Sequence, residues 1–487
     1  MNPKNYLPLL SLLLFFAISC NEKKEKSAVN NLENINNEVL QNSKAYATLK
    51  DITSTIGHRL TGSENGQEAE QYTYDLFKSY GMDEVKFHPF EVEAWSRDTV
   101  SIEFNGMLEE DVVSLGHSPV SADVRADLID LGNGLRADFE ASKQAVKGKM
   151  VLAYIGILPD SGDTLQNIHR SEKTALAIEY GAKGIVIINK VPKGVLLTGT
   201  ASVTGSLIDI PAVCITYEKG MELKERLSSG ENISTQIFMK NNSDVIKSRN
   251  VIATLKGSEF PDEHIVLGGH LDSWDLATGA IDNGIGIAAI LDMARTFKTL
   301  NIQPKRSIQF VMFMGEEQGL LGSKALVNDL IAKDELKNVR YMMNIDMSGN
   351  PKGYNASGRD DMVSVFNTIG ETIQQVDSSY ANSNKSKAGL HSDHQVYMME
   401  GVPVVGLVGN LEPIVYDFYH SNGDDFSLVN EEHLKNTVRF SSMFLYELAN
   451  LSEIPAKTLN FDETRAFLIE QDLKEQLVLG NEWKWGE

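Results

Sequence analysis

Apolar and polar positions alternate in a regular way through the second half of the chain. After Ser248, apolar runs such as 265–268 and 307–315 predict strands, and the amphipathic stretch 285–297 predicts a helix. The alternation continues to about Leu451. It predicts an α/β fold in which a mainly parallel mixed sheet is flanked by helices on both faces.

The first half begins with helical periodicity and then changes to strands. After the loop 57–63, a helix is predicted from about Asn65 to Tyr80, where Gly81 ends it. Alternating apolar and polar positions at 84–92 and 99–104 predict two strands. We expect these segments to belong to the same domain as the second half.

Residues 115–242 have a different pattern of predicted elements from the rest of the chain. Short strands and turns surround one predicted helix at 173–180, which lies between the apolar segments 147–155 and 181–188. A strand, a helix and a second strand in this order form a compact unit. We therefore expect a β-rich domain that is inserted into the main domain. A further helix is predicted at 461–479.

The N-terminus has the features of a secretory signal. Lys4 supplies a positive charge, and the apolar run 6–18 is too short to span a bilayer. Small residues before Cys20 resemble a bacterial lipobox. This predicts an exported protein that is lipid-anchored at Cys20 in a bacterial cell envelope, on the periplasmic or the cell-surface face. The alternative is a plain signal peptide with an incidental Cys20.

These segments together predict the domain organisation. The parts are a lipoprotein signal peptide at 1–20, a flexible tether at 21–40, an N-terminal part of the main domain at 41–114, the inserted domain at 115–242, the main domain at 243–455 and a C-terminal helical extension at 456–487. The polar tether would connect the lipid anchor to the folded body.

The composition excludes several classes of protein. With 45 Lys and Arg against 67 Asp and Glu, the formal net charge of −22 argues against nucleic-acid binding, which needs clustered basic residues. Hydrophobic residues make up 42% of the chain, which is typical of a globular protein. Cys20 and Cys214 are too few for a disulfide framework. Because Cys214 lies in an apolar run, we expect a buried, inert thiol.

Residue types that bind metals follow the predicted strands. They are His270 and Asp272 after 265–268, Asp282 before the helix 285–297, Glu316 and Glu317 after 307–315, Asp346 after 341–345 and His420 after 415–419. Because ligands bind at the carboxyl ends of strands in an open α/β sheet, these side chains should converge in one crevice. Carboxylates gathered there repel one another unless a cation neutralises them. The set suits zinc or a similar divalent ion.

The same segments resemble a known family. The blocks His270-Leu-Asp272, Ala280-Ile-Asp282-Asn283-Gly284, Glu316-Glu317-Gln318-Gly319, Asn344-Ile-Asp346 and Tyr419-His420-Ser421 resemble the signature of di-zinc exopeptidases of the M28 metallopeptidase family. Within this family, the segment 269–275 is most similar to the carboxypeptidase Q branch. The insert, with Gly181-Ala-Lys-Gly184 after its helix, is similar to the protease-associated domain.

The resemblance implies the zinc exopeptidase fold, which is of the phosphorylase/hydrolase-like type. It also implies a role for the residues of these blocks that match the family signature. Two zinc ions (Zn2+) would be held by five ligands, which are His270, Asp282, Glu317, Asp346 and His420. Asp282 would bridge the ions, His270 and Asp346 would complete one, and Glu317 and His420 the other. Glu316 would be the general base, and Asp272 would orient His270. The family also implies a cis peptide between Asp282 and Asn283.

Four further residues are weaker candidates. The segment 391–394 resembles a block that lines the crevice in this family, so Asp393 and His394 are candidates for contacting substrate or for supporting the metal ligands. Tyr419 is a candidate hydrogen-bond donor to the oxyanion. Trp274 is expected to be a wall of the site.

The function that the resemblance implies is hydrolysis of dipeptides, or removal of N-terminal residues from short peptides, by zinc-activated water with Glu316 as the base. The expected partners are short peptide substrates and a second copy of the chain in a homodimer. Contact with the membrane is expected through the lipid anchor alone, and no nucleic-acid partner is expected. Two alternatives stay open. One is a glutaminyl cyclase-like acyltransferase that uses one zinc, and the other is a non-catalytic binding protein on the same scaffold.

Overall fold

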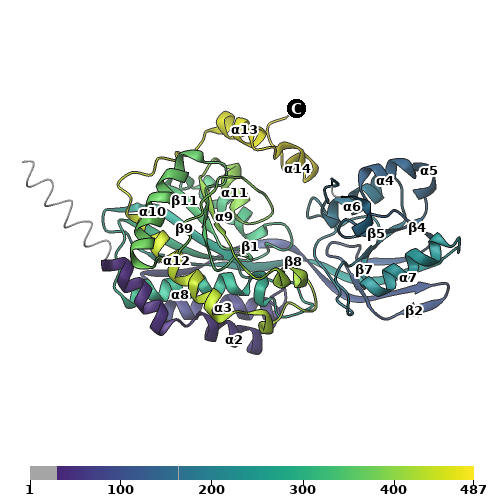
Figure 1. The fold of residues 1–487 in the computed structure, drawn as a ribbon, viewed down its shortest axis with the longest axis horizontal. Coiled ribbons are helices and arrows are strands. Elements are labelled where there is room, and N and C mark those ends of the chain that lie inside the picture. Colours follow the sequence, from purple (N-terminus) through teal and green to yellow (C-terminus); the bar gives the residue numbers. More distant parts are fainter. Residues whose placement is uncertain (1–29, 163, 487) are drawn as a thin grey trace, which may run out of the picture.

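The fold has two units that share one continuous sheet (Figure 1). The computed structural model describes residues 30–162 and 164–486. The predicted signal peptide at 1–20, its Cys20 and the first part of the predicted tether lie outside these residues. Among the described helices, none is both long enough and apolar enough to cross a bilayer.

The large unit contains the mainly parallel sheet that the alternation predicts. Its strands are β9 (Phe260–His270), β10 (Arg306–Phe313), β11 (Val339–Asn344), β12 (Gly353–Asn355), β13 (Val404–Val408) and one end of β8 (Ser234–Leu255). The strands β13, β11, β9 and β10 pair in parallel, and β12 and β8 are antiparallel to their neighbours. β10 and β11 are buried almost throughout, as expected for strands with both faces covered. The predicted fold class is therefore confirmed.

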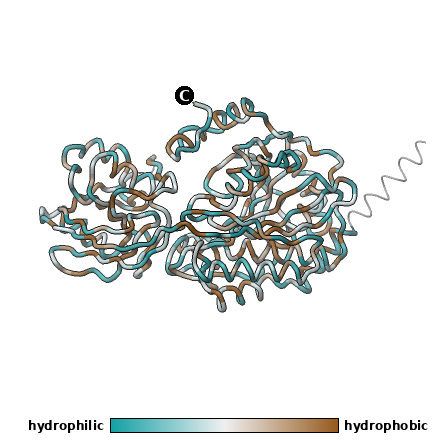
Figure 2. The backbone as a smooth tube through the Cα atoms, turned by 180° about the vertical axis from the view of Figure 1, so that it is seen from behind, coloured by the Kyte–Doolittle hydropathy of each residue, from teal (hydrophilic) through white to brown (hydrophobic). Residues whose placement is uncertain are grey.

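Helices cover both faces of this sheet. One face carries α2 (Ala45–Thr55), α3 (Glu64–Ser79), α8 (Ile285–Thr299), α10 (Val363–Val376) and α12 (Glu431–Asn450). The other carries α9 (Leu321–Ala332), α11 (His394–Met399), α13 (Phe461–Glu470) and α14 (Lys474–Leu479). In Figure 1, α2, α3 and α8 lie below the sheet and α9, α11 and α13 above it. Figure 2 shows hydrophobic and hydrophilic residues alternating along the lower helices, as expected when one side of each helix packs on the core.

Two long strands connect the units. β1 (Glu84–Phe104) and β8 pair antiparallel along nearly their whole length and extend from one unit into the other (Figure 1). The sequence predicts two strands at 84–92 and 99–104. The structure instead has one strand, with an irregularity between Arg97 and Thr99 that adds one unpaired residue. The connection between the units is therefore a hydrogen-bonded ribbon and not a linker.

The small unit lies between β1 and β8 in the sequence. Its elements are β2 (Met107–Glu109), β3 (Val112–Ser114), β4 (Ser121–Asp130), α4 (Arg136–Ala141), α5 (Lys143–Val146), β5 (Met150–Tyr154), α6 (Arg170–Glu179), β6 (Gly184–Ile188), β7 (Ala212–Ile215) and α7 (Tyr217–Ser228). β5, α6 and β6 form the predicted strand–helix–strand unit, with two parallel, fully buried strands. On β7, burial raises the pKa of the Cys214 thiol to about 12, which agrees with the predicted inert thiol.

Residues 30–42 are helical, so the prediction of a flexible tether at 21–40 is wrong for its second part. Leu32, Ile35 and Val39 are fully buried in the main hydrophobic cluster of the large unit. These three side chains repeat at the spacing of one helix face. Their burial outweighs the polar composition on which the tether prediction was based.

The C-terminal extension forms two short helices in place of the single helix predicted at 461–479. α13 and α14 are separated by a turn at Asp472, whose φ of 59° lies outside the helical region. Leu468, Leu473 and Leu477 anchor the segment by packing with residues of α9 and α11. The segment therefore lies against the large unit, and α14 is its part nearest to the small unit (Figure 1).

Candidate active site

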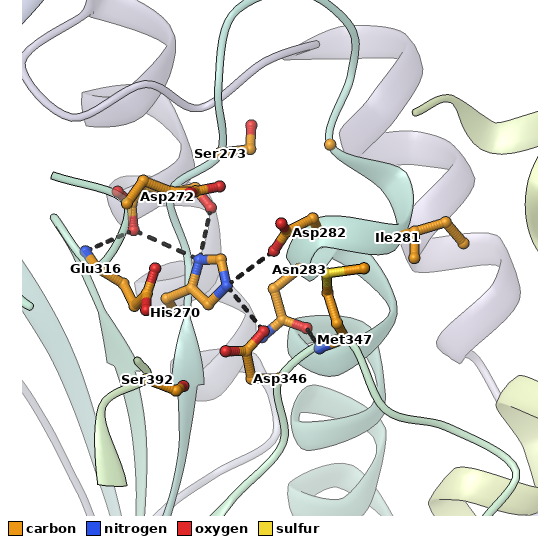
Figure 3. Close-up of polar contacts among 12 residues, drawn as sticks. His270, Asp272, Ser273, Ile281, Asp282, Asn283, Glu316, Asp346, Met347 and Ser392 are labelled. Atoms are coloured by element: carbon orange, nitrogen blue, oxygen red, sulfur yellow. Dashed lines mark hydrogen bonds and ion pairs between the residues drawn. The ribbon is translucent and has the colours of Figure 1, made fainter. Parts of the chain in front are cut away.

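Three of the predicted metal ligands, His270, Asp282 and Asp346, lie together at one edge of the parallel sheet (Figure 3). The register of β9 and β10 puts His270 opposite Phe313, so the loops after these strands begin at the same level. These loops and their neighbours bring together the five predicted ligands, His270, Asp282, Glu317, Asp346 and His420, with Glu316 beside them. The predicted convergence is therefore present, but the segment before His420 is a 3-10 helix (Pro413–Phe418) and not the strand predicted at 415–419.

Asp282 lies between two imidazole rings. Its Oδ1 is 3.1 Å from Nε2 of His270, and its Oδ2 is 3.0 Å from Nε2 of His420. On the first side, Oδ1 of Asp346 is 3.2 Å from the same nitrogen of His270. On the second side, Oε2 of Glu317 is 2.9 Å from Nε2 of His420. The side chains thus form two triads that share Asp282.

This donor set fits divalent metal ions. His270, Asp282 and Glu317 each offer an atom within 4.8 Å of the others. Oε1 of Glu317 is buried and has no hydrogen-bond partner among the described residues. Two imidazoles with three carboxylates supply the nitrogen and oxygen donors that zinc prefers. A cation between these carboxylates would relieve their mutual repulsion.

The pKa values of the triads reflect the crowding of charge. Burial works against the charged form of His270, but Asp346 and Glu316 outweigh it and raise its pKa well above the ordinary value. Burial also opposes ionisation of Asp282, but hydrogen bonds from His270 and His420 hold its pKa well below the ordinary value. The ring protons thus neutralise the carboxylates, which is the task that divalent cations would perform.

Glu316 faces the same cavity but belongs to neither triad. Burial, together with Asp346 and Glu317, raises the pKa of its carboxyl well above the ordinary value, against the opposing effect of His270. Its backbone N–H donates to Oδ1 of Asp272 over 3.1 Å. A carboxyl group with a raised pKa at such a place is suited to accept and return a proton.

Asp272 supports His270 through its main chain. Its carbonyl oxygen is 3.0 Å from Nδ1 of His270, whereas its carboxylate Oδ1 is 3.7 Å away, too far for a hydrogen bond (Figure 3). The carboxylate instead accepts from the backbone of Glu316 and from the hydroxyl of Thr61 over 3.0 Å. Asp272 therefore orients the ring with its carbonyl group and holds the predicted base with its side chain.

Arg59, in the loop 57–63, organises the loop that follows β9. Its fully buried guanidinium donates to the carbonyl oxygens of Leu271 (2.6 Å), Thr278 (2.7 Å) and Gly279 (2.9 Å). Burial lowers the pKa of Arg59 to about 10, so the group stays charged at neutral pH. No motif in the sequence indicates that Arg59 holds main-chain oxygens.

Asp424 and Asn283 fix the backbone around Asp282. The two carboxylate oxygens of Asp424 accept from the backbone N–H groups of Ile281 (2.7 Å) and Asp282 (3.0 Å). Asn283 donates to the carbonyl oxygen of Ile345 over 2.7 Å. The peptide bond between Asp282 and Asn283 is cis, as the family resemblance implies. Sequence reasoning does not identify Asp424, because its partners are backbone groups.

The small unit reaches into the site. Arg170, at the start of α6, has its Nη2 2.9 Å from Nδ1 of His420. The backbone N–H of Thr198 donates to the carbonyl oxygen of His420 over 2.8 Å. Gly199 permits this approach, because a methyl group there would lie 2.5 Å from the His420 ring and closer still to Arg170. The motifs give no sign of this contribution.

Two aromatic side chains pack against His420. Trp274 packs edge-on against His420, with ring centroids 6.1 Å apart. Tyr419 stacks on the same ring at 3.8 Å and lines the cavity. Gly116 lies against the indole, where a methyl group would approach it to 2.4 Å. Trp274 does not line the cavity that Tyr419 lines, so its role as a wall of the site stays a prediction.

A cavity of about 410 Å³ opens beside the triads. The large unit contributes the metal-ligand side, and the small-unit segments 169–172 and 200–205 lie across from it. The C-terminal segment adds Gln476, Leu479, Gly480 and Glu482 to the lining of the cavity. The cavity is large enough for a small ligand.

Asp393 and His394 do not line this cavity, although the sequence makes them candidates for substrate contact. Nε2 of His394 lies 3.2 Å from the carbonyl oxygen of Gly389. Asp393 is fully buried, and burial raises the pKa of its carboxyl to about 7. Their neighbours His391 and Gln395 line the cavity instead. A supporting role of Asp393 behind the metal ligands stays a prediction.

Comparison with known proteins gives a consistent result. Residues 250–445 match Peptidase family M28, and residues 120–223 match the PA domain. Carboxypeptidase Q from Xenopus laevis is 26% identical over 425 residues, which cover 84% of this chain and 87% of that protein.

Two solved structures have the same fold. A peptidase M28 precursor from Shewanella amazonensis SB2B has a TM-score of 0.76 at 23% identity and covers 89% of this chain and 99% of its own. A zinc aminopeptidase from Bacillus subtilis has a TM-score of 0.64 at 23% identity and covers 86% of this chain and 98% of its own. The motifs, the geometry of the site and these matches agree: residues 250–445 are similar to peptidase family M28, and residues 120–223 are similar to the PA domain.

Proposed function

We propose that this chain is a zinc-dependent exopeptidase that hydrolyses dipeptides or removes N-terminal residues from short peptides. The proposal is carried by Asp282, whose two oxygens lie 3.1 Å and 3.0 Å from ring nitrogens of His270 and His420. A carboxylate between two such groups is suited to bridge two ions, which supports a two-zinc centre. Asp346 would complete one ion and Glu317 the other. The activities named for carboxypeptidase Q and for the Bacillus aminopeptidase support the same reaction class.

The residues around the two triads have separate tasks in this hydrolysis. Bound zinc would lower the pKa of a water molecule and polarise the carbonyl group of the scissile bond. The carboxylate of Glu316 takes a proton from the attacking water and gives it to the leaving amine. Asp272 keeps Glu316 in place through the 3.1 Å bond to its backbone, and it orients His270 with its carbonyl oxygen. Tyr419 lies beside His420 at the cavity wall, where its hydroxyl is a candidate donor to the substrate oxyanion.

Metal analysis together with a peptide panel tests this proposal. The purified protein is expected to hold two zinc ions per chain and to cleave peptides with free N-termini but not N-acetylated ones. Glu316→Gln is expected to keep both ions and to lower kcat by at least about 10²-fold. Glu335→Gln, an exposed change of the same kind, is the control. Near-normal turnover in Glu316→Gln would remove Glu316 as the base, and wild-type protein without metal and without cleavage would overturn the function.

The proposal includes export and a lipid anchor on Cys20 in the bacterial cell envelope. The apolar run 6–18 and the small residues before Cys20 support it. Labelling with a fatty-acid analogue is expected to mark the wild-type protein and not Cys20→Ala. Equal labelling of both would contradict the anchor. The homodimer stays a prediction that a mass measurement in solution would check.

A further inference from the structure

The C-terminal segment forms one wall of the cavity beside the triads. Leu479, Gly480 and Glu482 line the cavity together with the small-unit loop 200–205. Figure 1 shows α14 between the upper helices of the large unit and α6 of the small unit, and Figure 2 shows the same segment from behind. This wall is built by the end of α14 and by the residues that follow it.

Hydrophobic packing holds the segment in place. Leu473 and Leu477 are buried in a cluster with Leu326 of α9 and Tyr397 of α11. Leu479, which is 39% exposed, lines the cavity, whereas the neighbouring Val478 is 53% exposed and does not line it. Leu473 and Leu477 thus anchor α14 to the large unit, and Leu479 lines the cavity.

Polar contacts tie the end of the segment to the rim. Oε1 of Glu482 is 2.6 Å from Nζ of Lys324 on α9. Nε2 of Gln395 on α11 donates to Oε2 of the same carboxylate. Both partners line the cavity. Glu482 therefore fastens the wall to the large unit at two points.

The wall also meets the small unit. A methyl group on Gly480 would lie 3.4 Å from the carbonyl oxygen of Val203, so these two backbones are neighbours. The same small-unit loop approaches the loop after β10, because a methyl group on Gly205 would lie 3.5 Å from the carbonyl oxygen of Gln318. The C-terminal segment, the small-unit loop and the loop after β10 therefore lie next to one another along one side of the cavity.

We infer that residues 479–482 determine substrate length and restrict the crevice to short peptides, with dipeptides favoured. The inference rests on the proposed function and specifies its substrate class. Each further residue of an extended peptide adds about 3.3–3.6 Å of chain. A longer peptide that leaves the cavity on this side has to displace Leu479 or separate Gly480 from Val203. A cavity of about 410 Å³ is also near the small end of ligand sites.

Two matched pairs of variants test this inference. Glu482→Ala removes both polar ties, and Leu479→Ala shortens the wall. The controls are Glu475→Ala and Val478→Ala, which change exposed side chains of the same helix. The assay measures kcat/KM for a dipeptide and for a pentapeptide with the same two N-terminal residues. The wild-type protein is expected to favour the dipeptide. The pentapeptide-to-dipeptide ratio is expected to rise about tenfold or more in the two test variants and to change less than about twofold in the controls.

Each outcome decides between the length limit and the function itself. Equal cleavage of both peptides by the wild-type protein would overturn the length limit and leave the proposed function standing. An unchanged preference in both test variants would also overturn it, because the wall would then lie elsewhere. Absence of any cleavage by zinc-loaded wild-type protein would overturn the proposed function. If thermal melting shows that Glu482→Ala is unfolded, Leu479→Ala carries the test.

Discussion

Replacing Asp424 by asparagine tests how the site holds its central carboxylate. Asp424 is 4% exposed, and its oxygens accept the backbone N–H groups of Ile281 and Asp282 at 2.7 Å and 3.0 Å. Asparagine has a single acceptor oxygen. One of the two N–H groups would therefore face an NH₂ group and lose its partner. We expect weaker zinc binding, because these bonds fix the backbone that presents Asp282 to both triads.

The expected magnitude follows from the lost acceptor. A buried N–H group without a partner is destabilising by about 1–3 kcal/mol. If this free energy falls on the metal-binding conformation, zinc affinity decreases by about 5-fold to 150-fold. Loss of a group that orients a metal ligand typically weakens binding by about 10–100-fold. We therefore expect Asp424→Asn to weaken zinc binding by about 10–100-fold.

Competition with a chromophoric chelator measures this change. The titration is best done at about pH 8, because burial raises the pKa of Asp424 to about 7 and the wild-type carboxyl is then ionised. Asp425→Asn is the matched control. Asp425 is exposed and accepts the backbone N–H of Ser427 over 2.7 Å, a capping role that asparagine also performs. Equal zinc affinity of the two variants would refute the reasoning.

Three further changes probe the centre, the N-terminal helix and a buried histidine. Asp282→Asn is expected to lower the zinc content to one ion per chain or none, since a neutral amide replaces the shared carboxylate; metal analysis that still finds two ions would exclude the bridging role. Ile35→Ala is expected to lower the free energy of unfolding by about 2–5 kcal/mol, because Ile35 is fully buried; urea denaturation measures it against the exposed Glu33→Ala, and equal stability of the two would contradict the packing of residues 30–42. His117→Asn is expected to flatten the pH dependence of stability between about pH 4 and 6.5. Burial lowers the pKa of His117 to about 4, so in this range the unfolded chain binds a proton that the folded chain does not, and wild-type stability falls as the pH decreases, by about 3 kcal/mol in total. Asparagine tolerates the φ of 63° at this position, and parallel stability curves of the two proteins would disprove the assignment.

The sheet and the gathering of the predicted metal ligands are predictable from the sequence because both follow regular patterns. The apolar runs before His270, Glu316 and Asp346 have the length and composition of buried strands. The carboxyl ends of parallel strands lie on one edge, so residue type and order suffice to bring these side chains together. The family resemblance alone implies that Asp282 lies between the two histidines.

The supporting residues are not predictable in the same way. Arg59 and Asp424 act on backbone carbonyl and N–H groups, which have the same chemistry at every position and leave no mark in the sequence. Arg170 reaches His420 from another unit, so its role depends on how the two units are placed. Such contacts are set by tertiary structure and not by local pattern.

The helix at 30–42 is a different case, because a signal is present in the sequence. Leu32, Ile35 and Val39 are spaced by three and four residues, which is the period of a helix that packs on one side. The many asparagines and glutamates between them have the composition of a linker. Composition averages over all faces of a helix, whereas burial depends on one face, so the periodic signal is the better guide here.

The ribbon of β1 and β8 has a consequence for how this architecture can change in evolution. Because each strand continues from the large unit into the small one, the small unit is not a module that hangs on a flexible loop. Removal of the small unit would leave the large-unit ends of β1 and β8 without their continuation. It would also remove Arg170 and the segment around Thr198, which contact His420. Unfolding of the small unit is therefore expected to break strand pairs and site contacts of the large unit as well. A relative without the small unit would need different ends for β1 and β8 and, at the same time, different support for the loop that carries His420.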